Sequence, residues 1–213
     1  MQELLKHIRT FSNMSQAEFA EYLNVSFATV NRWENERAIP NKLAQSKIYD
    51  FCKKNGVPVY EMTLQRIQNA AQAVELEAGR VLLYHGSKSG IEGAIEPKSR
   101  KQCDFGKGFY MGTDPSQALT LICDYEKSKL YLVSIDTRQL AMLDVPADIN
   151  WAMLVAYNRG RMERISGTSF YSKYRDMAAS KDLIVGSIAN DRMFYVIDNF
   201  FIGNVTDSAL VHS

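Results

Sequence analysis

The chain has 213 residues, of which 46% are hydrophobic and 23% are charged, and its formal net charge at pH 7 is +1. This hydrophobic content is ordinary for a globular protein, so disorder along the whole chain is excluded, and the length suffices for one large domain or two small ones. The near-zero net charge excludes a general electrostatic attraction to nucleic acid, so any basic surface must be local.

The cysteines, the histidines and the apolar runs predict a cytoplasmic protein without a metal. Cys52, Cys103 and Cys123 are odd in number and widely spaced, which suits reduced thiols rather than a disulfide framework. The chain has only three histidines and no paired Cys/His spacing, so we expect no structural zinc site. We also expect no membrane association, because no apolar run approaches ~20 residues and a signal peptide is lacking.

Residues 1–66 are predicted to form an all-α domain. Ser15 and Glu18 have the spacing of a capping box, which marks the start of a second helix. After a short turn, Ser26 is expected to begin a third helix that ends near Asn35. Two short helices joined by so brief a turn meet the description of a helix-turn-helix. The expected core residues of the motif are Ala20, Leu23, Val25, Val30 and Trp33.

The stretch from Met14 to Asn35 (MSQAEFAEYLNVSFATVNRWEN) resembles the phage-repressor-like (XRE) helix-turn-helix family. The resemblance implies that a homodimer binds double-stranded DNA, with Asn31 and Arg32 pairing with base edges in the major groove. Phosphate contacts are expected from the start of the second helix and from Lys6 or Arg9. The candidate DNA-binding residues are Gln16, Ser26, Phe27, Thr29, Asn31 and Arg32. The alternative is a dimerisation or antitoxin-like module that does not bind DNA.

A further helix is predicted from Lys42 to Lys54, and Pro58 breaks the pattern after it. From Val59 to about Gly79 the composition favours a helical connector, of which we assign residues 67–80 as the linker. Its apolar positions could also pair with a second subunit.

Two strand signals lie beside glycines at the start of the C-terminal part. The apolar run Val81–Tyr84 predicts a buried strand, and His85 follows it in a break that contains glycine and serine. A glycine-rich turn (DFGKG) precedes residues 109–111, which are expected to form another strand. Because glycine lets the backbone approach a ligand while His85 and Tyr110 offer hydrogen bonds and a stacking face, we predict a cleft here.

The remaining elements alternate irregularly, which indicates an α+β domain rather than a doubly wound one. Helices are expected from Asp114 to about Glu126, from Asn150 to Arg161 and from Phe170 to Ala179. Strands are expected at residues 129–135 and 182–191, with a short segment at 140–143 and a strand or helix start at 193–197.

The part of the chain from Val81 to the end (residues 81–213) resembles the ADP-ribosyltransferase fold, and more narrowly a bacterial family of uncharacterised domains, DUF3990. The resemblance is carried by LYHGS at Leu83–Ser87, DFGKGFY at Asp104–Tyr110 and the helix opening DPSQA at Asp114–Ala118. It implies that NAD is bound as a substrate and that no metal takes part. The implied NAD-binding residues are His85, Gly86, Ser87, Lys107, Gly108 and Tyr110.

The resemblance also implies a role for three of these residues. His85 would hold the adenosine ribose, the Gly86 backbone would pair with the nicotinamide amide, and Tyr110 would stack on the nicotinamide ring. Transferases of this fold usually add a glutamate (less often another polar residue) on a late strand, where it supports the charge that develops on the ribose. After Tyr110 the chain has only Glu126 and Glu163, neither on a late-strand signal.

Asp191, in a polar turn after the expected strand at 182–191, is therefore the candidate third catalytic residue beside His85 and Tyr110. Family members usually continue past the stretch at 206–213 into a last strand that bears a glutamine, and this strand is expected to be missing here.

These resemblances predict an all-α helix-turn-helix domain fused to an α+β ADP-ribosyltransferase-like domain. The expected function is transfer of ADP-ribose from NAD to a macromolecular acceptor by a DNA-binding protein, in a toxin–antitoxin or phage-defence setting. The alternative is a one-component transcription regulator whose C-terminal domain senses NAD or ADP-ribose without catalysis. The lack of a late glutamate favours the alternative, and the presence of His85 and Tyr110 favours the enzyme.

Overall fold

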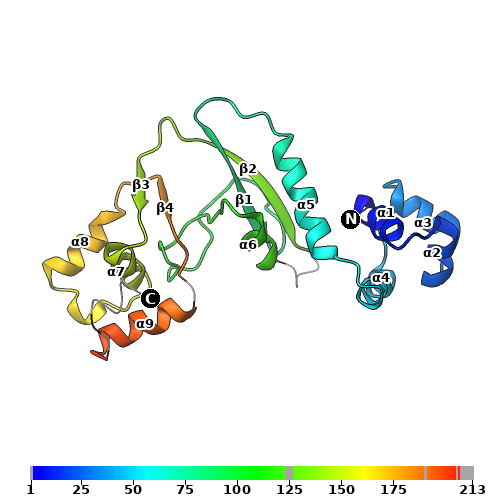
Figure 1. Ribbon diagram of the computed structural model, residues 1–213. Coiled ribbons are helices and arrows are strands. Elements are labelled where there is room, and N and C mark those ends of the chain that lie inside the picture. Colours follow the sequence, from blue (N-terminus) through cyan, green and yellow to red (C-terminus); the bar gives the residue numbers. More distant parts are fainter. Residues whose placement is uncertain (1, 123–126, 190, 205, 207–213) are drawn as a thin grey trace. The chain divides into compact units, whose positions relative to one another are not determined.

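The computed structural model describes residues 2–122, 127–189, 191–204 and 206, apart from the side chains of residues 2, 3 and 191. The chain divides into two compact units, Met1–Glu75 and Leu76–Ser213. The boundary lies between the last helix of the first unit and the first strand of the second (Figure 1). No helix within the described ranges is long and apolar enough to cross a membrane.

The N-terminal unit is helical, as expected. Its helices are α1 (Gln2–Phe11), α2 (Gln16–Leu23), α3 (Phe27–Glu34), α4 (Lys42–Lys54) and α5 (Val59–Gln72) (Figure 1). The capping box at the start of α2 is confirmed: Ser15 Oγ accepts from the Glu18 amide at 3.2 Å, and Glu18 Oε2 accepts from the Ser15 amide at 2.7 Å. Between α2 and α3, Asn24 adopts a left-handed conformation (φ 56°), which turns the chain within a few residues.

One apolar core holds these helices together. The predicted core residues Ala20, Leu23, Val30 and Trp33 are buried, and Val25 is partly buried against them. The remaining buried members are Leu5, Ile8, Phe19, Ala44, Ile48, Phe51, Cys52 and Val57. These residues come from α1 to α4 and from the segment before α5, so the whole N-terminal unit shares one core.

A buried ion pair ties α1 to α3. Arg9 Nε donates to Glu34 Oε1 at 2.7 Å, and a second guanidinium nitrogen donates to Glu34 Oε2 at 3.1 Å. The Glu34 side chain is only 3% exposed. Burial opposes ionisation of Glu34, but hydrogen bonds from Arg9 and Gln16 outweigh it and hold the pKa of Glu34 below its usual 4.5.

This depressed pKa predicts acid sensitivity of the N-terminal unit. The carboxylate of Glu34 stabilises the folded unit fully above about pH 4.5, and this contribution is lost as the pH falls through the lower pKa of the folded state. In thermal unfolding between pH 6 and 3, Glu34→Gln should remove part of the pH dependence. The matched control Glu21→Gln, at an exposed position of α2, should leave it unchanged; an equal effect of both would contradict the assignment.

The C-terminal unit mixes helices with two small sheets, in agreement with the predicted α+β class. Strand β1 (Arg80–Ser87) pairs antiparallel with β2 (Lys129–Asp136). Strand β3 (Met142–Val145) pairs parallel with β4 (Leu183–Gly186). The helices are α6 (Pro115–Thr120), α7 (Ile149–Asn158), α8 (Ser169–Met177) and α9 (Asp191–Phe201), with a 3₁₀ turn η1 at Glu163–Ile165 (Figure 1).

Helix α7 is the centre of the second core. Six consecutive residues, Trp151–Ala156, are buried, so this helix is apolar on all sides and enclosed. Residues of α8, α9, β3 and β4 pack around it. The crossover from β3 to its parallel partner β4 therefore contains the most deeply buried helix of the unit.

Several elements differ from the sequence-based expectation. Residues 109–111 form no strand, because the Tyr110 carbonyl accepts from the His85 ring, and only Gly112 bridges to Tyr84 of β1. The expected strand at 182–191 ends at Gly186, since the Ser187 carbonyl accepts from the Trp151 indole. Residues 193–197 lie in α9. The helix expected from Asp114 to about Glu126 ends at Thr120, and residues 123–126 lie outside the described residues.

Candidate functional site

The first candidate site is the exposed face of α3. Phe27 is 54% exposed, and Arg32 lies on the solvent side of the helix. Ser26 caps α3: its Oγ accepts from the Thr29 amide at 3.2 Å and lies 2.9 Å from the Thr29 hydroxyl. Ser26 thus fixes the start of α3, and the Arg32 side chain is exposed on this helix.

Two hydrogen bonds connect the exposed face of α3 to the ion pair of Arg9 and Glu34, through Gln16 and Asn31. Gln16 Nε2 donates to Glu34 Oε2 at 2.7 Å, and Asn31 Nδ2 donates to Gln16 Oε1 at 3.3 Å. The amide of Gln16 is therefore held in a fixed orientation. Arg9 is bound inside the unit to Glu34 and to the Met14 carbonyl. Of the two cations expected to contact phosphate, this leaves Lys6, which is exposed.

Arg32→Ala should weaken binding to a preferred DNA sequence by about 1–3 kcal/mol and relax the base preference at one position. The reason is that arginine pairs bidentately with guanine, a contact that alanine cannot make. Fluorescence anisotropy on preferred and scrambled duplexes measures both effects. Arg37→Ala, at an exposed position just past α3, is the control and should leave the ratio of the two affinities unchanged. A uniform loss with Arg32→Ala would instead assign Arg32 to phosphate.

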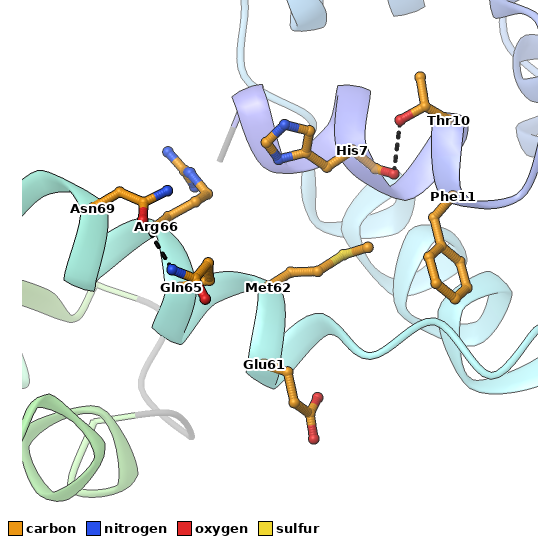
Figure 2. Close-up of a pocket in the computed structure, with 8 residues that line it drawn as sticks. All are labelled: His7, Thr10, Phe11, Glu61, Met62, Gln65, Arg66 and Asn69. Atoms are coloured by element: carbon orange, nitrogen blue, oxygen red, sulfur yellow. Dashed lines mark hydrogen bonds between the residues drawn. The ribbon is translucent and has the colours of Figure 1, made fainter.

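A hollow in the N-terminal unit lies between α1 and α5 (Figure 2). It is lined by His7, Thr10, Phe11, Glu61, Met62, Gln65, Arg66 and Asn69. Met62 extends from α5 toward α1 and packs against the core, and Phe11 is 51% exposed (Figure 2). Met62, one of the apolar positions after Val59 that could pair with a second subunit, is thus partly buried against the core of its own unit.

The second candidate site is the contact between β1 and the stretch around Tyr110. His85 Nδ1 lies 2.7 Å from the Tyr110 carbonyl oxygen. Because a carbonyl only accepts, Nδ1 carries the proton, and Nε2 of the neutral ring is an acceptor. The His85 ring is half-buried and stacks on Phe109, with centroids 4.1 Å apart and planes 25° apart. The two sequence motifs thus meet at this histidine.

Tyr110 itself turns back toward its own loop. Its hydroxyl donates to the Gly106 carbonyl at 2.8 Å and accepts from the Phe105 amide at 3.0 Å. Burial, with smaller effects from its neighbours, raises the pKa of Tyr110 to about 12. The hydroxyl is therefore protonated at any physiological pH, and the ring lies across the loop beside Gly108.

The other residues predicted to line the site lie at the end of β1, in the loop of Tyr110 and at the start of α9. A Cβ on Gly86 would lie 2.4 Å from the Ala118 carbonyl oxygen, so only glycine lets α6 pack against β1 at this point. Ser87 is half-buried at the end of β1. Gly108 donates its amide to Ser99 Oγ at 2.9 Å, and Lys107 is exposed. Asp191 is the first residue of α9, and its side chain lies outside the described atoms.

A buried carboxylate that the sequence did not single out organises this region. Asp104 is 4% exposed. Its Oδ1 accepts from Arg159 Nε at 2.8 Å and from a terminal nitrogen of Arg159 at 2.6 Å, while Oδ2 accepts from the Ala189 amide at 2.9 Å. Asn158 also donates to the Asp104 carbonyl. Asp104 therefore joins the loop of Tyr110 to the end of α7 and to the segment before α9.

The fold and these sites define a helix-turn-helix protein with an α+β C-terminal unit. The profile of a family described as Helix-turn-helix matches residues 5–45, and that of the family described as Protein of unknown function (DUF3990) matches residues 81–213. Since the second match covers more than half of the chain, the chain belongs to the DUF3990 family. The first supports binding of double-stranded DNA by the N-terminal unit. No curated protein and no solved structure matched the chain.

Proposed function

We propose that the C-terminal unit binds NAD and transfers its ADP-ribose to a macromolecular acceptor, while the N-terminal unit binds DNA. The observation that carries this proposal is the contact of His85 with Tyr110. A 2.7 Å hydrogen bond brings together two motifs that lie 25 residues apart and that resemble the NAD-binding motifs of ADP-ribosyltransferases. Similar motifs placed far apart would not support a common ligand.

The proposed chemistry assigns separate tasks to the two rings. Nε2 of His85 accepts from a hydroxyl of the adenosine ribose, because Nδ1 is engaged with Tyr110. Tyr110 acts through its ring face and not as a base, since its hydroxyl keeps its proton. The bond between the ribose and nicotinamide breaks, nicotinamide leaves with the electron pair, and a nucleophile of the acceptor bonds to the ribose carbon and loses a proton to water. A carboxylate, for which we propose Asp191, supports the cationic ribose.

The alternative is a regulator whose C-terminal unit senses NAD or ADP-ribose without catalysis. One feature of the described residues favours it: Glu163, one of two glutamates after Tyr110, lies exposed in η1 rather than on a late strand. A sensor needs the binding residues but no carboxylate at the ribose.

Nicotinamide release distinguishes these functions. The full chain is incubated with NAD, free nicotinamide is measured by chromatography, and the intact protein and a cell lysate are examined by mass spectrometry for ADP-ribose adducts. The transferase releases nicotinamide and forms adducts, and both should fall with Asp191→Ala. Calorimetric binding of NAD without nicotinamide release supports the sensor. Absence of NAD binding contradicts the transferase, and absence of binding of both NAD and ADP-ribose contradicts the sensor as well.

A further inference from the structure

A basic hollow on the C-terminal unit is lined by none of the residues assigned to NAD. It is lined by Arg100, Lys101, Gln102, Arg159, Gly160 and Arg161. These residues come from two segments, the loop that leads to Asp104 and the turn that follows α7. Four of the six are cations, none is acidic and none is aromatic, so the lining is suited to an anion.

The balance of charge at this basic hollow is positive. Asp104 neutralises Arg159, and Asp198 pairs with Arg161 at 2.9 Å. Within the described ranges no ion pair involves Arg100 or Lys101, and both residues are exposed. Two positive charges are therefore in excess. The Arg161 side chain is itself 54% exposed and can share its donors with a bound anion.

The lining favours phosphate groups of nucleic acid over a free nucleotide. A nucleotide site also needs a surface that holds the base, commonly an aromatic ring or an apolar wall, and the lining residues provide neither. Arginine and lysine donors without such a wall fit a repeated phosphate backbone, which proteins grip independently of sequence.

The connection between the units makes such a contact effective. Residues 73–79 join α5 to β1, so the basic hollow is tethered to the DNA-binding unit by a short segment. Once α3 is on DNA, a second contact by the same chain is intramolecular, with an effective concentration in the millimolar range. We propose that the basic hollow binds the phosphate backbone of the same double-stranded DNA, as a second contact that is independent of sequence.

The salt dependence of DNA binding by the full chain tests this proposal. Binding of a random-sequence duplex is measured by anisotropy between about 50 and 200 mM salt, where each phosphate contact contributes about 0.9 to the slope of log K against log salt. The double variant Arg100→Gln/Lys101→Gln should reduce the magnitude of the slope by about 0.9–1.8. Neither residue is buried, so the fold should persist, which circular dichroism checks.

A matched variant separates a local contact from the total charge. Lys127→Gln/Lys181→Gln removes two exposed cations that do not line the basic hollow, and it should leave the slope at the wild-type value. An unchanged slope in the Arg100/Lys101 variant, or an equal reduction in both variants, would overturn the proposal. Calorimetry with ADP is the third measurement: ADP binding that only the Arg100/Lys101 variant loses, with the DNA slope unchanged, would assign the basic hollow to a nucleotide and also overturn it.

Discussion

Replacing Asp104 by alanine is expected to lower the free energy of unfolding of the C-terminal unit by about 2–4 kcal/mol, because the buried carboxylate accepts three hydrogen bonds while Arg159 stays one-third exposed. Arg159 would lose its carboxylate partner, although it still lies over the Phe194 ring, 3.4 Å from the centroid. The Ala189 amide would also lose its acceptor. Asp104→Asn should cost less, because its amide oxygen can still accept one of these hydrogen bonds.

Urea unfolding followed by tryptophan fluorescence measures this loss in one unit at a time. The chain has two tryptophans, Trp33 in the N-terminal unit and Trp151 in α7, so a Trp33→Phe background leaves only the signal of Trp151. The control is Asp198→Ala in the same background. Its pair with Arg161 is 43% and 54% exposed, so its removal should cost at most about 1 kcal/mol. Equal, small effects of both variants would show that the Asp104 pair does not hold the loop in solution.

The features of the N-terminal unit that could be predicted from the sequence are local ones. The capping box of Ser15 and Glu18 depends on residues three positions apart, and both hydrogen bonds are present. The buried residues of the motif could be predicted because apolar residues recur at helical spacing in both α2 and α3. The ion pair of Arg9 with Glu34 joins positions 25 residues apart, and no spacing rule connects them. For this reason the sequence left Arg9, like Lys6, as a candidate for a phosphate contact.

In the C-terminal unit the sequence indicated the motifs but not the contacts between them. The sequence indicated a glycine-rich turn at Asp104 but not the partners of its carboxylate. These partners, Arg159 and Ala189, lie 55 and 85 residues further along the chain. A strand was expected at 109–111 because three bulky residues follow a glycine-rich turn. Its pairing with β1 is limited by the His85 ring, which takes the Tyr110 carbonyl. The stacking of Phe109 on His85 is visible only in the folded chain.

His85→Ala is expected to weaken NAD binding by about tenfold or more. The loss combines a hydrogen bond to ribose with the ring that stacks on Phe109, and an interaction of about 1.4 kcal/mol corresponds to tenfold in affinity. This variant also removes the hydrogen bond to the Tyr110 carbonyl, so alone it does not separate binding from positioning of the loop.

His85→Asn separates the two roles. The asparagine amide nitrogen can take the place of Nδ1 and still donate to the Tyr110 carbonyl, but the shorter side chain has no atom at the position of Nε2. If Nε2 binds the ribose, His85→Asn should bind NAD as weakly as His85→Ala, although its hydrogen bond to the Tyr110 carbonyl should make it more thermally stable than His85→Ala. If His85 serves only to position the loop, His85→Asn should bind NAD like the wild type, and the proposed contact with ribose is wrong. Calorimetry with NAD and thermal unfolding of the two variants therefore decide whether this histidine touches the ligand.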